Sequence, residues 1–288
     1  MHKSRFSAQK VMFLGYNTNG MAHHDLFDAV RLLAEIGYRG VAITIDHGVL
    51  SPYEKGSKRQ LIELKKLLRD LGLRSVVETG ARFLLDSRVK HEPTLVSADP
   101  RRRIEFYKFA VDCAAELGSD CVSLWSGAVR DGISRDEAEK RLSQGLRNVF
   151  DYAAGQGVVI AMEPEPGMLI DSTKRFEDFL KQIDAPHLRL TLDIGHLHCQ
   201  GETPIAEVIR RFQARLVNVH VDDMKSGVHE HLMFGEGEIN FPPALAALAE
   251  SGYTGGLYVE LNRHSHEAAE AAKKAFDFFQ GSGFSVKG

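Results

Sequence analysis

The chain has 288 residues, of which 43% are hydrophobic and 26% charged, a balance typical of a globular protein. Its formal net charge of −3 provides no overall attraction to nucleic acid or to an anionic membrane. No apolar run approaches the roughly 20 residues of a membrane span, and the basic residues Lys3 and Arg5 are not followed by the apolar stretch of a secretory signal. The three cysteines, Cys113, Cys121 and Cys199, form no CxxC pair. We therefore expect a cytoplasmic protein with neither a nucleic acid nor a membrane as its partner.

Strand-like and helix-like patterns alternate along nearly the whole chain. Strands are expected at residues 11–18, 40–46, 74–79, 121–126, 158–162, 188–193, 216–222 and 256–261. Helices are expected to follow them at residues 25–36, 57–71, 102–117, 135–154, 173–182, 205–212, 242–250 and 266–279. These eight βα units, with no linker between them, predict a single-domain α/β protein, a (β/α)8 TIM barrel over residues 1–288. An open doubly wound sheet is the competing fold, but it usually has fewer strands and a glycine-rich first turn.

A long polar loop, residues 82–99, follows the third expected strand. Loops of this length inside compact domains are often functional lids. We therefore expect the loop to cover one side of a pocket. The next helix opens with Arg101, Arg102 and Arg103, which are expected to face solvent.

Four expected strands end in a side chain that can bind a metal ion. The apolar runs that lead to Glu163, Asp193, His220 and Glu260 are short and partly β-branched, as buried strands are. Catalytic groups of a TIM barrel lie at the C-terminal ends of its strands. If the four strands are parallel neighbours, their terminal side chains can converge. Two glutamates, one aspartate and one histidine would then form a site for a divalent metal ion.

These strand ends belong to five longer segments with a recognisable order and spacing. They are Ala161-Met162-Glu163-Pro164, Leu192-Asp193-Ile194-Gly195-His196, Val219-His220-Val221-Asp222-Asp223, Phe234-Gly235-Glu236-Gly237-Glu238-Ile239 and Val259-Glu260-Leu261. In these segments the chain resembles the xylose-isomerase-like TIM-barrel superfamily. That superfamily contains sugar phosphate isomerases, ketose 3-epimerases, hydroxypyruvate isomerase, inosose dehydratase and the type IV AP endonucleases.

The resemblance implies that Glu163, Asp193, His220 and Glu260 bind one divalent metal ion. Three oxygen ligands and one imidazole favour Mn²⁺, Mg²⁺ or Co²⁺, with Zn²⁺ as an alternative. A metal that holds a carbonyl and a neighbouring hydroxyl acidifies the carbon-bound proton between them. Removal of this proton gives a cis-enediolate. By resemblance to the family's epimerases, Glu163 and Glu260 are also the catalytic acid/base pair.

Five further residues are expected to contact the substrate. By the same resemblance His196 contacts substrate oxygens, and His231 is a candidate for the substrate or for a further metal. Glu165 lies on the same side of an extended segment as the preceding glutamate, so we place it next to the metal ligands or on the substrate. Trp125 ends the fourth expected strand, where it can stack on a sugar face or pack in the core. His47 ends the second expected strand and completes the set.

Together these residues predict a divalent-metal-dependent sugar or polyol isomerase or epimerase. An unphosphorylated substrate is favoured, because Glu236 and Glu238 stand in the glycine-rich loop where many TIM barrels bind phosphate. A metal-dependent lyase acting on a cyclic polyol needs the same metal and base and stays as the alternative. A type IV AP endonuclease-like phosphodiesterase is less favoured, since its Asp-x-His motif is replaced here by His229-Glu230-His231. The intact metal-ligand set argues against a barrel that only binds a ligand. The oligomeric state stays open, with a homo-oligomer as one option.

Overall fold

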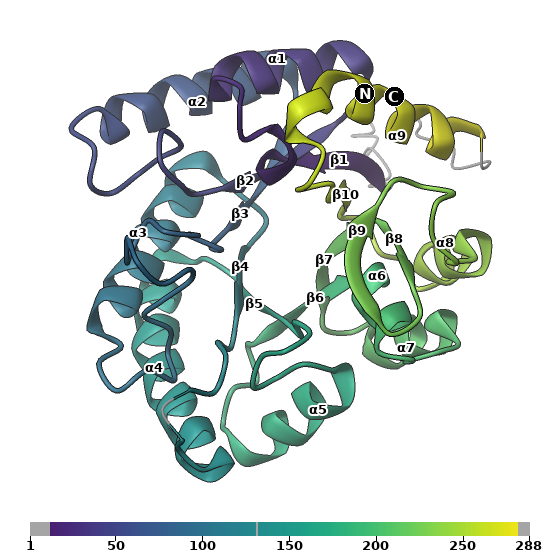
Figure 1. Ribbon diagram of the computed structural model, residues 1–288. Coiled ribbons are helices and arrows are strands. Elements are labelled where there is room, and N and C mark those ends of the chain that lie inside the picture. The colour runs from purple at the N-terminus through teal and green to yellow at the C-terminus, as the bar shows by residue number, and fades with distance from the viewer. Residues whose placement is uncertain (1–11, 131, 282–288) are drawn as a thin grey trace, which may run out of the picture.

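The computed structural model describes residues 12–130 and 132–281 and contains a closed barrel of parallel strands (Figure 1). The strands of the barrel are β1 (Phe13–Asn17), β2 (Gly40–Thr44), β3 (Arg74–Glu78), β4 (Val122–Trp125), β5 (Ile160–Glu163), β6 (Arg189–Asp193), β7 (Leu216–Val221) and β10 (Gly256–Val259). Their order around the barrel is β1-β10-β7-β6-β5-β4-β3-β2, so neighbours in the chain are neighbours in space. The predicted (β/α)8 TIM barrel is confirmed. Val11, which was expected to begin the first strand, and the basic residues before it lie outside the described residues.

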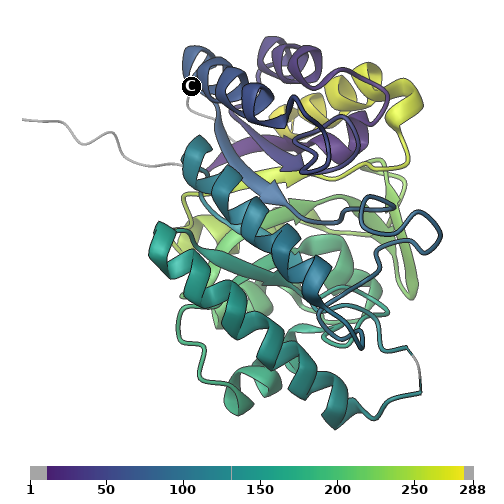
Figure 2. The ribbon, with the colours of Figure 1, turned by 90° about the vertical axis from the view of Figure 1, so that its left-hand side faces the viewer.

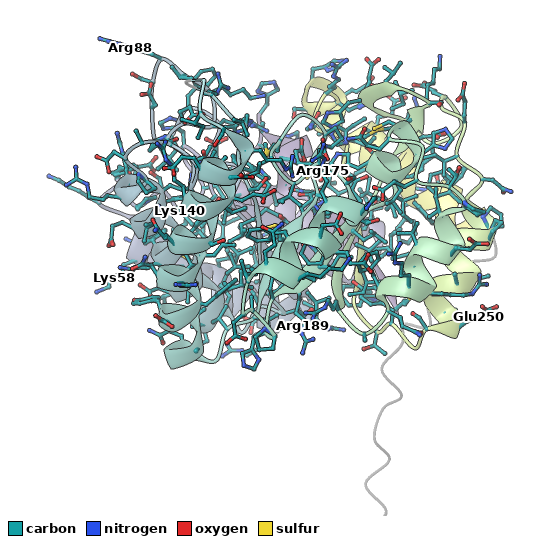
Figure 3. The ribbon with its side chains drawn as sticks, turned by 90° about the horizontal axis from the view of Figure 1, so that it is seen from below. Lys58, Arg88, Lys140, Arg175, Arg189 and Glu250 are labelled. Carbon is teal, nitrogen blue, oxygen red and sulfur yellow. The ribbon has the colours of Figure 1, made fainter. Side chains whose placement is uncertain are left out.

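The helices form the outer layer, as Figures 1 and 2 show. They are α1 (Leu26–Ile36), α2 (Ser57–Leu71), α3 (Arg101–Leu117), α4 (Arg135–Gln156), α5 (Thr173–Gln182), α7 (Ile205–Phe212), α8 (Phe241–Glu250) and α9 (Ala268–Gly281). Each packs its apolar side on the barrel and exposes charged side chains, such as Lys58, Lys140 and Glu250 (Figure 3). Asp25 begins α1 by accepting hydrogen bonds from two backbone amides of the first turn. In the described ranges no helix is both long and apolar enough to cross a membrane.

Three elements on the C-terminal side of β6 and β7 were not expected from the sequence. The short helix α6 (Ile194–Cys199) begins directly after β6, and the Oδ1 atom of Asp193 accepts a hydrogen bond of 2.9 Å from the amide of His196. Strands β8 (Asp223–Lys225) and β9 (Val228–Leu232) form an antiparallel hairpin where a loop was expected. The helix α6 and the hairpin both carry histidines towards the same end of the barrel. Short 3₁₀ helices, η1 (Thr18–Met21) and η2 (Ser265–Glu267), complete this end.

The inside of the barrel changes from apolar to polar along the strands. Side chains two positions apart point to the same face of a strand, so each strand contributes to successive layers. A small apolar cluster fills the lower layer: Phe13, Ala42, Val76, Cys121, Ala161 and Tyr258. Two positions further along the strands, the inward residues are polar: Thr44, Glu78, Ser123, Glu163 and Glu260, with Thr191, Asn218 and His220 from β6 and β7. This alternation brings the polar strand ends to one face.

Gly15 of β1 gives the Tyr258 ring its space in the lower layer. A Cβ atom at this position would lie 2.4 Å from Cδ1 of the fully buried Tyr258 ring. We expect Gly15→Ala to lower the free energy of unfolding by about 1–3 kcal/mol, because the ring has no room to move. Gly155→Ala, on the exposed side of α4 with nothing nearby, is the control and should raise it by about 0.5–1 kcal/mol. Urea unfolding followed by circular dichroism measures both, and a Gly15→Ala variant as stable as the native chain would contradict the packing argument.

Candidate functional site

A cavity of about 560 Å³ opens at the C-terminal ends of the barrel strands. Its lining includes four residues of the inner polar layer, Glu78, Glu163, His220 and Glu260. Strand β5 ends at Glu163 because Pro164 follows and has no amide hydrogen for the next bond of the ladder. In β7, His220 points inwards while Val219 and Val221 face the helices, as period-two alternation requires.

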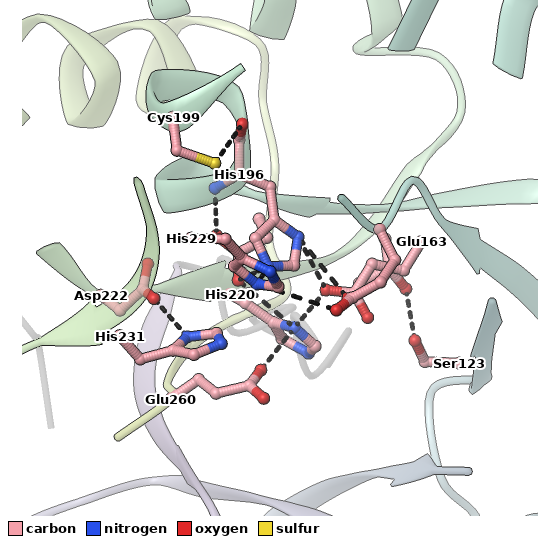
Figure 4. A network of polar contacts seen from close by, with 12 residues as sticks. Ser123, Glu163, His196, Cys199, His220, Asp222, His229, His231 and Glu260 are labelled. Atoms are coloured by element: carbon pink, nitrogen blue, oxygen red, sulfur yellow. Dashed lines mark hydrogen bonds and ion pairs between the residues drawn. The ribbon is translucent and has the colours of Figure 1, made fainter. Parts of the chain in front are cut away.

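The four residues expected to bind a metal ion meet at the floor of this cavity, and Figure 4 labels Glu163, His220 and Glu260 among them. One ligand atom from each of Glu163, Asp193, His220 and Glu260 lies within 4.8 Å of the others. The Nδ1 atom of His220 is 3.1 Å from Oε1 of Glu163, 2.9 Å from Oε2 of Glu260 and 4.0 Å from Oδ2 of Asp193. This Oδ2 atom is buried and accepts no hydrogen bond from the described part of the chain. The arrangement fits a divalent cation, which would use the unbonded oxygen and the facing nitrogen.

Concentrated negative charge dominates the electrostatics of this floor. Burial works against a charged imidazole, but the carboxylates of Glu163, Glu78 and Glu260 outweigh it and raise the pKa of His220 well above its usual range. Burial also raises the pKa of Glu163 to about 7. His220 and Glu163 thus keep protons at a pH at which the same groups in water would have lost them. The same field that holds these protons favours a divalent cation.

Three histidines form a second cluster beside the metal-ligand set. One nitrogen from each of His196, His229 and His231 lies within 4.8 Å of the others, and the Nε2 atoms of His196 and His229 are 3.0 Å apart. The Nδ1 atom of His231 forms an ion pair with the fully buried Asp222 (Figure 4). Burial lowers the pKa of His196 to about 4, so its ring is neutral at physiological pH. Neutral imidazoles can donate or accept hydrogen bonds with sugar hydroxyls.

Glu165 belongs to the histidine cluster, whereas Glu163 belongs to the metal-ligand set. The carboxylate oxygens of Glu165 lie 3.8 Å from Nδ1 of His196 and 3.7 Å from Nε2 of His229. The sequence spacing could not decide between the two glutamates. In the structure both carboxylates lie within 4 Å of Nδ1 of His196, but of the two only Glu163 also faces Nδ1 of His220.

Arg103 does not face solvent, so the expectation for the Arg101–Arg103 run is wrong at this residue. Its side chain is fully buried, and its guanidinium donates hydrogen bonds to the backbone carbonyls of Thr79 at 3.1 Å, His91 at 2.7 Å and Pro93 at 2.7 Å. Adjacent positions on a helix point about 100° apart. Arg101 and Arg102 are therefore exposed, while Arg103 turns under the long loop and fastens it.

The fastened loop forms one wall of the cavity, on the side of β3 where it was expected. His91 lines this wall, and its Nδ1 atom is 2.7 Å from the carbonyl oxygen of Gly80. The ring packs edge-on against Trp125 with 5.2 Å between ring centroids. Burial lowers the pKa of His91 to about 4, so Nδ1 carries the proton that Gly80 accepts and Nε2 is left as an acceptor. The sequence did not place His91 among the substrate contacts, because its position depends on the path of the loop.

Of the five residues expected to contact the substrate, four lie at the main cavity and one lies elsewhere. Trp125, Glu165 and His231 line the cavity, and His196 places Nδ1 3.6 Å from Oε1 of Glu163. His47 is exposed and lines a smaller neighbouring cavity of about 210 Å³. The structure therefore brings four of the five together and leaves His47 apart.

Loss of the Arg103 fastening should loosen the loop and leave the barrel folded. We expect Arg103→Met to speed amide hydrogen exchange in residues 80–93 at least about tenfold, since charge-assisted hydrogen bonds contribute about 1.5–3 kcal/mol each. Arg102→Met is the matched control, because Arg102 is exposed and hydrogen-bonds only Tyr53 among the described residues. Hydrogen exchange measured by mass spectrometry tests this. Equal exchange in both variants would show that Arg103 does not hold the loop.

Comparison with known proteins places this geometry in a family. The sequence model of the xylose isomerase-like TIM barrel matches residues 30–281. The L-ribulose-5-phosphate 3-epimerases UlaE of Shigella flexneri and Salmonella paratyphi C are 26% and 27% identical over 252 residues, which cover 85% of this chain and 86% of each relative. A D-tagatose 3-epimerase-like protein has a similar structure, with a TM-score of 0.74, 24% identity and coverage of 94% of this chain and 99% of the other. The D-allulose 3-epimerase of Methylomonas sp. also has a TM-score of 0.74, with 20% identity and coverage of 95% and 98%. The chain belongs to the xylose isomerase-like TIM barrel family.

Proposed function

We propose that this protein is a divalent-metal-dependent epimerase that acts on a ketose. The observation that carries the proposal is the convergence of Glu163, Asp193, His220 and Glu260 at the floor of one cavity. Two of these ligands are glutamates on the non-adjacent strands β5 and β10, so two carboxylates can reach a bound substrate from different directions. The relatives named as 3-epimerases support the same reaction class.

The proposed reaction inverts the carbon next to the ketone. A divalent ion, when bound, would polarise the ketone and its neighbouring hydroxyl and so acidify the hydrogen on that carbon. One of Glu163 and Glu260 removes this proton to give a cis-enediolate, and the other returns a proton to the opposite face. Asn19 orients Glu260, since its side-chain amide donates a hydrogen bond of 2.7 Å to Oε1. We propose Mn²⁺, Mg²⁺ or Co²⁺ as the ion because three carboxylates and one imidazole suit these metals.

The histidine cluster and the loop wall are proposed to hold the rest of the sugar. His196, His231 and Glu165 offer hydrogen-bonding groups on one side, and Trp125 offers an apolar ring edge on the other. The buried aromatic surface suits the C–H face of a sugar, while the polar groups suit its hydroxyls.

A neutral sugar remains the favoured substrate. Arg82, Lys90 and Arg263 line the cavity, and two of these three cations are already paired, Arg82 with Asp46 at 3.4 Å and Arg263 with Glu230. Cations that are already paired attract a phosphate less strongly. A substrate screen should nevertheless contain both D-tagatose and L-ribulose 5-phosphate, because relatives carry both names.

Metal binding should stabilise the protein, because a cation relieves repulsion among the clustered carboxylates. After removal of metal with a chelator, Mn²⁺ at about 100 times its Kd should add about 2.7 kcal/mol of stability, measured as a rise in Tm by calorimetry. Asp193→Asn should lose most of this rise. The asparagine can still cap α6 through its side-chain oxygen but has no charge for the ion. An equal rise in the variant and the native protein would contradict the ligand assignment.

Proton transfer through the two glutamates gives the direct test of the proposed reaction. The native enzyme should incorporate deuterium from D₂O at the inverted carbon of its ketose product, as detected by NMR. Glu163→Gln and Glu260→Gln keep the size of the side chain but remove the base, so each should lose at least roughly 10²-fold in turnover. Glu236→Gln, which changes an exposed carboxylate on a nearby loop, should retain activity. Conversion without solvent exchange would contradict the two-base route and point to hydride transfer or to internal return of the same proton.

A further inference from the structure

A buried carboxylate lies inside the barrel next to the metal-ligand set. The interior of a TIM barrel is usually filled by branched apolar side chains. Here Glu78, at the end of β3, is only 6% exposed. An ionised carboxylate in such a place is costly unless hydrogen bonds compensate for its lost hydration. A role that explains this cost should therefore be visible in its contacts.

Both side-chain hydrogen bonds that Glu78 makes with the described residues end on β7, on the far side of the barrel. Its Oε1 atom lies 2.9 Å from Nε2 of His220 and 2.9 Å from Nδ2 of Asn218. Strands β3 and β7 are four places apart in the closed barrel in either direction, so the carboxylate reaches across the interior. Asn218 is fully buried and is held in turn by Thr191, at 3.3 Å. Ser123 bonds the other side of Thr191 at 2.9 Å.

This contact determines which nitrogen of His220 is free for a ligand. A cation held by Glu163 and Glu260 would take the place of a proton on Nδ1, and the hydrogen bond to the carboxylate of Glu78 would then keep the remaining proton on Nε2. Nδ1 is the atom that faces Glu163 and Glu260. We propose that Glu78 is a positioning residue that holds the His220 ring across the barrel with Nδ1 directed at the metal ion. The inference rests on the metal site of the proposed function and adds to it a residue outside the ligand set.

Three roles for Glu78 predict different orders of metal affinity among its variants. If it positions His220, a glutamine should substitute well, because its oxygen can accept from the same two donors. An aspartate keeps the charge but is one methylene shorter, and a methionine fills the space without an acceptor. If Glu78 acts only through its charge, aspartate should be the best replacement. If it only fills space, all three variants should bind metal alike.

The experiment measures the affinity of metal-free protein for Mn²⁺ by isothermal titration calorimetry. We expect Glu78→Gln to stay within about threefold of the native protein and Glu78→Asp and Glu78→Met to bind about 10–100-fold more weakly, the usual effect of losing such a partner. Ser123→Ala removes a polar group from the same layer without contacting a proposed ligand, and should bind Mn²⁺ normally. Equal Mn²⁺ affinities in all variants, or tighter Mn²⁺ binding by Glu78→Asp than by Glu78→Gln, would overturn the proposal.

A second readout reports the ring itself and needs no substrate. In Zn²⁺-loaded protein with ¹⁵N-labelled histidine, NMR should show the proton of His220 on Nε2 in the native protein and in Glu78→Gln. Glu78→Asp still tests the proposal if Glu78→Met does not fold. Epimerase assays of the native enzyme are independent of these measurements. If the native enzyme is inactive but the variants show the expected order of Mn²⁺ affinity, the proposed reaction is rejected and the positioning role of Glu78 is kept. If the native enzyme is active but the affinities do not follow that order, only the role of Glu78 is rejected.

Discussion

The geometry of a closed parallel barrel puts the last inward side chain of each strand into a common space. In this protein those positions hold Glu163, Asp193, His220 and Glu260, and on β6 and β7 the inward residues beneath them, Thr191 and Asn218, are polar as well. The apolar cluster around Phe13 and Tyr258 is confined to the opposite end of the barrel. The chain therefore holds together a group of charges that would separate in water. Strand pairing below the site and the helices outside it supply the stability that this concentration of charge opposes.

The pKa values of the buried acidic groups show how the protein tolerates this concentration of negative charge. Burial raises the pKa of Asp222 and of Glu165 well above the usual range, and repulsion from Asp193 and Glu163 acts in the same direction. The histidines His231 and His196 lie between these groups. Imidazoles thus lie among the carboxylates and offset part of their mutual repulsion. This arrangement leaves a cation and a polar sugar as suitable occupants of the same space.

The sequence predicted the barrel and the composition of the candidate metal centre because both depend on local patterns. An apolar run that ends in Glu163 or His220 indicates within a few residues that a strand is present, which way it runs and where it ends. Other features depend on segments far apart in the chain. Nothing next to Glu78 indicates that β7 lies opposite it, and nothing next to Arg103 indicates that loop carbonyls will cover it. His47 also follows a strand, but the turn that begins at Asp46, closed by a bridge to Val49, directs it outwards.

Arg103 fastens the cavity wall through backbone carbonyls, and every residue type has a carbonyl. The side chains of the wall can therefore change without loss of the bonds that hold its path, provided that the backbone conformation is kept. Lys90 and Arg82 line the cavity, and among the described residues neither accepts a hydrogen bond from Arg103. Substitutions there would alter which sugars fit while the barrel and the metal-ligand set stay unchanged. The loop can thus change the lining of the cavity without changing the metal-ligand set, and it is the natural segment to randomise when a new substrate specificity is sought.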